Sequence, residues 1–273
     1  MEIVLTGTGS PLPDANRAGP STLVKAGDAQ ILVDAGRGVV MRMAGAGALP
    51  GFLTAVLVTH LHSDHLCALN DVITTHWVMT QGNGTLAVYG PPGIAQFVQR
   101  QLHALEPDIG YRIAHHEELT DGPRVDVTEL AAGDTFDVGG VSVATAATEH
   151  APVRPTIGFR MTHDGSVAAL VGDTIPCDGV DALAAGADAY VQTVIRRDLV
   201  EAIPIQMVQD ILDYHSGVDD AARTAARVGV KKLVLTHMVP APTEDQYPQW
   251  RAIAAEHFDG EVVIGGDLTQ VTV

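Results

Sequence analysis

The chain has 273 residues, of which 46% are hydrophobic and 18% are charged, the balance of a globular protein. It holds 16 basic and 33 acidic residues, including only three lysines, and its formal net charge is −17. Long polyanions are bound through many Lys and Arg contacts, so this charge argues against extended nucleic-acid binding. No run approaches the roughly 18 apolar residues of a membrane span, and no signal-peptide pattern precedes the first strand, so we expect a cytoplasmic protein without a membrane segment.

The first half of the chain alternates short strands with helices. Apolar periodicity predicts strands at 2–5, 21–25, 29–33, 55–58 and 85–89, and helices at 38–46, 66–80 and 94–105. The run Gly90-Pro91-Pro92-Gly93 ends the last of these strands and starts the last of these helices. Residues 106–124 show no regular period and are predicted to be irregular.

From residue 124 the apolar period changes to two, which is typical of antiparallel strands. Strands are predicted at 124–128, 135–138, 141–147, 156–162, 166–171, 188–195 and 231–236, helices at 178–186, 204–213, 218–228 and 243–257, and two strands close the chain. The dipeptide Asp164-Gly165 is a strong hairpin signal. No repeat or linker divides the chain, so residues 1–273 are predicted to form one domain. Its two similar halves predict an α/β fold, a four-layer αββα sandwich of two mixed sheets with helices outside.

Six consecutive residues, His60-Leu61-His62-Ser63-Asp64-His65, lie between a predicted buried strand and a predicted helix. A tight turn there can aim two imidazoles and a carboxylate into one concave spot. Divalent ions of borderline softness, zinc first among them, suit such ligands. This spacing favours a metal site over a loop that is histidine-rich by chance.

Three further side chains of metal-binding type stand at or just after the ends of apolar strands: His150, Asp173 and His237. Strand ends are rigid and gather at one edge of a sheet, where sites are built. A lone histidine at any of these positions would more often be structural. Their shared context, beside the six-residue cluster, favours the interpretation as ligands.

The run from His60 to His65 resembles the H-x-H-x-D-H signature of the metallo-β-lactamase superfamily. The chain also has a His after a strand, a Gly172-Asp173-Thr174 turn and a Leu235-Thr236-His237 ending, in the family's order. Further segments look like the ribonuclease Z and phosphodiesterase branch, with its arylsulfatase-like relatives: Gly7-Thr8-Gly9, Val33-Asp34-Ala35-Gly36 and Tyr214-His215-Ser216-Gly217. The resemblance covers nearly the whole chain and implies the αββα fold and a dinuclear zinc centre.

The resemblance also implies a role for each site residue. His60, His62 and His150 would hold a first metal, Asp64, His65 and His237 a second, and Asp173 would bridge the two. Two Zn2+ ions per chain are expected, with Mn2+ or iron as substitutes. Two ions about 3.5–4 Å apart can share one hydroxide. Asp64 would aim that hydroxide, and His215 resembles the family's proton donor to the leaving alkoxide.

Two departures from ribonuclease Z shape the functional prediction. That family carries a long arm that grips transfer RNA, where this chain has only the hairpin 159–171. It also has a His-Glu-Ala-Thr segment whose Glu orients the catalytic His, where this chain reads Val191-Gln192-Thr193-Val194. By this resemblance Gln192 could hydrogen-bond His215 but could not stabilise its imidazolium by charge.

We therefore expect a dinuclear-zinc phosphodiesterase acting on small or cyclic phosphodiesters, a small-molecule ester substrate, and by family resemblance a homodimer. The alternatives are a ribonuclease Z-type endoribonuclease, or an arylsulfatase, lactone or β-lactam hydrolase. A non-enzymatic, metal-stabilised binding module is a further alternative, although it would need no unliganded His215.

Overall fold

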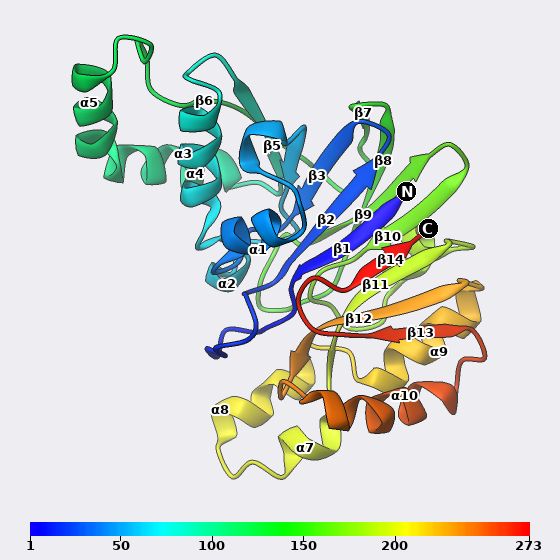
Figure 1. The fold of residues 1–273 in the computed structure, drawn as a ribbon. Helices are drawn as coiled ribbons and strands as arrows, with labels where there is room; N and C mark the ends of the chain where they lie inside the picture. Colours follow the sequence, from blue (N-terminus) through cyan, green and yellow to red (C-terminus); the bar gives the residue numbers. More distant parts are fainter.

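Two seven-stranded mixed sheets face each other in the computed structural model, which describes residues 1–273 (Figure 1). The first sheet has the order β14 (Gln270–Thr272), β1 (Glu2–Gly7), β2 (Ser21–Ala26), β3 (Ala29–Val33), β4 (Ala55–Leu57), β5 (Thr85–Gly90) and β6 (Arg124–Glu129). The second has the order β13 (Glu261–Ile264), β12 (Lys232–Val239), β11 (Ala189–Ile195), β10 (Ser166–Leu170), β9 (Ile157–His163), β8 (Val141–Ala147) and β7 (Thr135–Val138). Each sheet has a parallel half, β3 to β6 and β10 to β13, continued by antiparallel strands.

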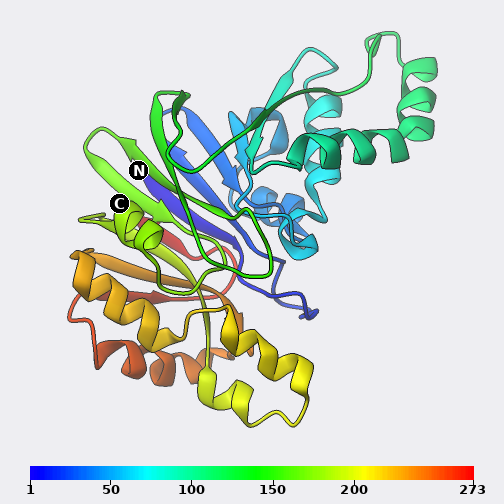
Figure 2. The same cartoon turned by 180° about the vertical axis from the view of Figure 1, so that it is seen from behind.

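Helices form the two outer layers, which Figure 2 shows from behind. Five helices follow strands of the first sheet: α1 (Val39–Gly45), α2 (Ser63–Leu66), α3 (Leu69–Met79), α4 (Ile94–Ala104) and α5 (Glu106–His115). Five belong to the second half: α6 (Asp178–Ala184), α7 (Arg197–Glu201), α8 (Gln206–Gln209), α9 (Val218–Val228) and α10 (Tyr247–Ala255). Short 3-10 turns lie at η1 (Pro50–Phe52), η2 (Asp210–Asp213) and η3 (Glu244–Gln246). None of these helices has both the length and the apolar character needed to cross a membrane.

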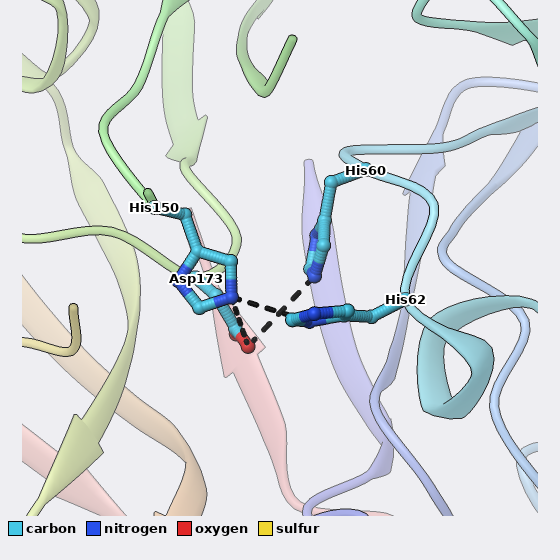
Figure 3. A group of neighbouring side chains, drawn as sticks. All are labelled: His60, His62, His150 and Asp173. Carbon is cyan, nitrogen blue, oxygen red and sulfur yellow. Dashed lines mark hydrogen bonds and ion pairs between the residues drawn. The ribbon is translucent and has the colours of Figure 1, made fainter. Parts of the chain in front are cut away.

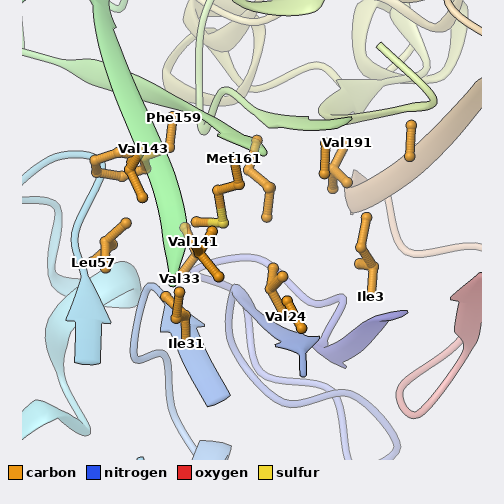
Figure 4. Packing of buried hydrophobic residues seen from close by; sticks show 14 of the residues in the cluster. Ile3, Val24, Ile31, Val33, Leu57, Val141, Val143, Phe159, Met161 and Val191 are labelled. Carbon is orange, nitrogen blue, oxygen red and sulfur yellow. The ribbon is translucent and has the colours of Figure 1, made fainter. Parts of the chain in front are cut away.

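The strand alternation explains why the layers stack in this order. Val33 and Leu57 point into a central cluster of 22 buried residues shared by the two sheets, whereas Leu32 and Val56 point outward under α1, α3 and α4. Figure 4 shows the central cluster, with side chains from both sheets interdigitating. A third cluster packs α6, α9 and α10 against the outer face of the second sheet. The predicted αββα sandwich is therefore confirmed.

The end of the chain ties the two halves together. After β13 in the second sheet, the chain crosses back, and β14 pairs antiparallel with β1 in the first sheet, which brings the two termini side by side (Figure 1). Both sheets also share the central apolar cluster. On these grounds we propose that residues 1–273 fold as one domain.

Several predicted boundaries are wrong. Residues 106–115 form α5 rather than irregular chain; Pro107 and Gly110 hide its period, and none of its residues is buried. The predicted helix 66–80 is divided into α2 and α3. Strand β6 pairs parallel with β5, although its alternation suggested an antiparallel partner. The predicted helix 204–213 is α8 followed by η2, and α7 precedes them.

Candidate metal centre

The fold brings all seven predicted ligand side chains together at one end of the two sheets. They form two groups, in each of which the ligand atoms lie within 4.8 Å of one another: His60, His62, His150 and Asp173, and Asp64, His65 and His237. Figure 3 shows the first group converging, with two histidines from the turn after β4 and the other two side chains from separate segments of the second half. Their role as metal ligands is developed below as a proposal.

The turn after β4 is held by close backbone packing. The amide of Ala35 donates to the carbonyl of His65 at 2.7 Å. A Cβ atom on Gly36 would lie 2.7 Å from the carbonyl oxygen of Asp64, so only glycine allows this approach. The first turn of α2 therefore lies directly against the loop that follows β3, and this contact fixes where Asp64 and His65 point.

A bulge in β12 positions His237. Thr193 pairs with Thr236 and Ile195 pairs with Val239, so β12 contains one more residue than β11 across this step. His237 has a left-handed φ of 46° within this irregularity. Bulges re-aim side chains beside active sites, and here the bulge places His237 Nε2 at 3.3 Å from Asp64 Oδ2.

Three histidines each form a hydrogen bond between Nδ1 and an acceptor of the protein. His65 Nδ1 lies 2.7 Å from Asp34 Oδ2, His60 Nδ1 lies 3.0 Å from the Thr59 hydroxyl, and His150 Nδ1 lies 2.9 Å from the Tyr214 carbonyl. Bonds of this kind set the tautomer and leave the Nε2 lone pair free.

Several polar atoms that face the centre are buried and have no hydrogen-bond partner, namely His60 Nε2, His65 Nε2 and Asp173 Oδ1. Buried polar groups are nearly always satisfied, so orphaned acceptors that converge on one point fit a bound cation. Imidazole nitrogens with a few carboxylates are the donor set of zinc and its neighbours.

Asp173 lies between the two groups. Its Oδ2 atom is 3.9 Å from His60 Nε2 and 3.8 Å from His150 Nε2 in the first group, and 3.4 Å from His65 Nε2 and 3.5 Å from His237 Nε2 in the second. Burial would raise the pKa of this carboxyl, but His237 and His65 outweigh it and hold the pKa well below its usual range. This central position is the one predicted for a bridging ligand.

The histidines divide by electrostatic environment. Burial lowers the pKa of His60 well below its usual value and that of His150 to about 4, so both rings are neutral and have a lone pair available. Burial also acts to lower the pKa of His65 and His237, but Asp173 and other nearby carboxylates raise both above the usual value. The carboxylates thus favour positive charge at the centre, as divalent cations would supply.

His215 stands beside the two groups without belonging to either. It is buried, its Nε2 lies 3.2 Å from Asp173 Oδ2, and its Nδ1 lies 3.1 Å from the Ile211 carbonyl. The suggestion that Gln192 orients it is wrong. Gln192 is fully buried, donates to the Thr193 carbonyl at 2.7 Å and accepts from the Tyr190 hydroxyl, because its side chain points toward the helical layer.

Sequence reasoning missed the groups that orient the ligands. Asp34 was noticed only as part of a family segment, and Thr59 and Tyr214 were given no role. One signal was available: Asp34 directly follows β3, the same strand-end context that drew attention to Asp173 after β10.

A hollow of about 820 Å³ opens beside the first group. His150 forms part of its wall, with Arg154, Cys177 and Asp178 among the other lining residues. Arg154 is exposed there, four residues after His150. Of the seven candidate ligands, only His150 lines this hollow.

Comparison with known proteins assigns the chain to a class. The sequence model of the β-lactamase superfamily domain matches residues 29–238, and the chain belongs to this superfamily. The metallo-β-lactamase fold protein YhfI from Bacillus subtilis has the same fold, with a TM-score of 0.75 and 22% identity over 99% of this chain and 98% of that chain. Human tRNase Z, short form, gives a TM-score of 0.73 and 22% identity over 100% and 99% of the two chains.

Within that superfamily the chain belongs to the ribonuclease Z family. It is 54% identical over 275 aligned positions to Ribonuclease Z of Mycobacterium bovis (strain BCG / Pasteur 1173P2), covering 100% of this chain and 98% of that protein. It is 53% identical, with the same coverage, to Ribonuclease Z of Mycobacterium tuberculosis (strain ATCC 25618 / H37Rv). The prediction of a metal-dependent, ribonuclease Z-like hydrolase is confirmed.

The expectation of a small-molecule ester substrate, with extended nucleic-acid binding unlikely, is wrong, because these full-length relatives are ribonucleases by name. The missing arm does not separate this chain from them, since an alignment of 275 positions that covers all 273 residues of this chain leaves no room for a long insertion in the relative. Net charge misled for a physical reason: it sums over the whole surface, whereas a substrate meets only the groups around one site.

Proposed function

We propose that this protein is a ribonuclease Z-type endoribonuclease that hydrolyses a phosphodiester bond of RNA at a two-metal centre. The observation that carries the choice of substrate is the match over the full length to proteins named Ribonuclease Z. The chemistry is supported by the site itself, because two groups of ligand-type side chains meet at Asp173 with His215 beside them.

In this proposal His60, His62 and His150 hold one ion, Asp64, His65 and His237 hold the other, and Asp173 contacts both. The histidine-rich set favours zinc, with manganese or iron as substitutes. When bound, such ions supply Lewis-acid chemistry, in that they lower the pKa of a water molecule and offset charge on the phosphate oxygens.

Asp64 has a second task beyond binding. One of its oxygens, Oδ2, lies toward His237, and the other can accept a hydrogen bond from the attacking water and aim it at phosphorus. Its lowered pKa keeps the carboxylate ionised and able to accept. Burial opposes that shift, and the hydrogen bond from His237 is the first of the influences that overcome it.

His215 completes the reaction. As water adds to phosphorus, the bond from phosphorus to the leaving ribose oxygen breaks, and a proton on His215 Nε2 passes to that oxygen. The Ile211 carbonyl holds Nδ1–H and so aims Nε2 toward the centre. General acid catalysis of this kind contributes about 10²- to 10⁴-fold to a rate.

A side-by-side assay tests the proposal. The zinc-loaded protein is given a precursor transfer RNA, an unstructured RNA, bis(p-nitrophenyl) phosphate, a cyclic nucleotide, p-nitrophenyl sulfate, a lactone and a chromogenic β-lactam. We expect RNA to give the highest kcat/KM and the cleavage to be endonucleolytic. Metal-free protein serves as the control for contaminating nucleases.

A higher kcat/KM on the cyclic nucleotide, the sulfate or an acyl substrate would overturn the assignment to RNA. Zinc binding without turnover of any substrate would favour a metal-stabilised binding module. The homodimer implied by family resemblance stays a prediction, which sedimentation of the purified protein would test.

A further inference from the structure

Thr59 has no role in the proposed reaction and lies where the two sheets meet. It follows β4, immediately precedes His60, and is 2% exposed. Its neighbours come from both sheets: Asp34 follows β3 of the first sheet, and Gly172 follows β10 of the second. The carbonyl of Thr59 accepts from the amide of Ile157 at 3.0 Å, which joins the sheets at this point.

The hydroxyl of Thr59 has two close partners. Its Oγ1 lies 2.9 Å from Asp34 Oδ2 and 3.0 Å from His60 Nδ1. A hydroxyl has a single proton, and two oxygens at 2.9 Å with no proton between them would repel each other. The hydroxyl therefore donates to the carboxylate, and His60 must donate its Nδ1–H to the hydroxyl. That fixes the tautomer of His60 with Nε2 as the free acceptor.

Asp34 connects the same hydroxyl to the other group. Its Oδ1 accepts from the backbone amide of Thr59 at 2.8 Å, and its Oδ2 accepts from His65 Nδ1 at 2.7 Å. His65 is thereby left with Nε2 as its free acceptor, and this atom is buried without a partner, as is Nε2 of His60. A single chain of hydrogen bonds, His60 to Thr59 to Asp34 to His65, thus joins one histidine of each group.

Packing keeps this chain in one arrangement. A Cβ atom on Gly172 would lie 2.8 Å from both the Cβ and the Oγ1 of Thr59, so the loop that carries Asp173 presses against the Thr59 side chain. Gly172 also has a left-handed φ of 65°, which glycine adopts without strain. The segment that positions Asp173 therefore packs closely against the Thr59 side chain.

We infer that Thr59 is a positioning residue whose hydroxyl orients ligand histidines of both metal groups, His60 directly and His65 through Asp34. This inference rests on the proposed two-metal centre. The two effects should be unequal: without the hydroxyl, His60 loses its only acceptor at Nδ1, whereas His65 keeps its own bond to Asp34. Loss of the hydroxyl should therefore weaken the His60 group more than the His65 group.

The test uses Thr59→Val, which keeps the shape of the side chain and removes the hydroxyl, and Thr59→Ser, which keeps the hydroxyl. Thr145→Val is the matched control, because Thr145 is equally buried and donates to the Ala131 carbonyl at 2.7 Å, away from the centre. Zn2+ affinity is measured by competition with a chelating indicator, and bound zinc is counted by elemental analysis. His62→Ala and His237→Ala identify which binding step belongs to which group.

We expect Thr59→Val to weaken the His60-group zinc by about 10- to 100-fold, the usual effect of removing a partner that orients a metal ligand. The His65-group zinc should weaken less, and Thr59→Ser should bind both ions much as the wild type does. The melting temperature of metal-free Thr59→Val should fall no further than that of Thr145→Val.

Two results would overturn the inference: wild-type zinc affinity at both groups in Thr59→Val, or a loss that Thr59→Ser does not rescue. If the wild-type protein itself binds no zinc, the proposed metal centre fails instead, and the two failures are thereby distinguished.

Discussion

The turn after β4 supplies four of the seven candidate ligands from six consecutive residues, whereas the second half of the chain supplies three from the ends of three strands. The first set is held by local contacts, such as the bond from Ala35 to His65 and the packing of Gly36 on Asp64. The second set depends on how β8, β10 and β12 lie in the sheet. One region provides a compact ligand cluster, and the other decides whether that cluster becomes a two-metal site.

This contrast predicts that substituting a candidate ligand from the second half of the chain will cause the greatest loss of bound metal and activity. In Asp173→Ala both groups lose the carboxylate that lies between them, so we expect the loss of both ions and no measurable RNA cleavage. His62→Ala removes a ligand of the turn that serves the first group alone, and it should retain one ion. Elemental analysis and an RNA cleavage assay measure both outcomes.

Asp188→Ala is the control for Asp173→Ala, since this carboxylate directly precedes β11, away from the centre, and pairs with Lys231. It should keep both ions and full activity. Two tightly bound ions in Asp173→Ala would show that the groups are independent and that the bridge is assigned to the wrong residue.

The next largest effect is expected for His215→Ala, which should impair catalysis without impairing metal binding. His215→Ala should keep both ions, because His215 belongs to neither ligand group, and should lower kcat on RNA by about 10²- to 10⁴-fold. The loss should shrink for bis(p-nitrophenyl) phosphate, whose acidic leaving group departs without a proton. Kinetics on both substrates, together with metal analysis, measure the difference.

His163→Ala, a partly buried histidine at the end of β9, is the control for His215→Ala and should leave kcat unchanged. An equal loss on both substrates, or loss of metal, would contradict the acid role and leave a structural role for His215.

The same contrast explains what the sequence could predict. The ligand-type side chains of the turn from His60 to His65 were predicted to lie together because the six residues are local, and the structure brings them close. His150, Asp173 and His237 were found from strand-end context together with family resemblance. The Asp34–Thr59 link was missed because it depends on the pairing of β3 with β4, where Val33 lies opposite Leu57. The periodicity of apolar residues in a sequence does not show which strands will be neighbours.

Errors at the level of the fold have a similar cause. Helix α5 has no buried residue, so its sequence lacks the apolar stripe that would indicate a helix. The bulge that turns His237 toward the centre is likewise a property of the paired strands β11 and β12. Gln192 was assigned to His215 by family analogy, although the alternation along β11 directs its side chain toward Tyr190 instead.

Gln192 therefore offers a smaller test within the second region. Gln192→Glu restores the carboxylate of the family segment, yet it should give no gain in kcat, because the side chain does not reach His215. A buried carboxylate facing the Thr193 carbonyl should instead lower the free energy of unfolding by about 1–3 kcal/mol or more. Thermal unfolding of the metal-loaded protein measures this, with exposed Gln99→Glu as the control. A rise in kcat would mean that Gln192 contacts His215 during turnover.

The smallest expected effect concerns the hollow beside His150, at the edge of the second region. Arg154 is exposed there and faces the same space as Glu149 and Asp178, so the cavity is not uniformly basic. If an RNA phosphate lies in it, Arg154→Ala should raise KM for RNA up to about fivefold, because one exposed ion pair contributes at most about 1 kcal/mol. The slope of log KM against log salt concentration should decrease by about one, because one phosphate contact is lost, while kcat stays constant.

Arg251→Ala is the control, because Arg251 is exposed on α10 at the outer face. It should change neither KM nor the salt slope. An unchanged salt slope in Arg154→Ala would show that no RNA phosphate contacts Arg154 in this hollow.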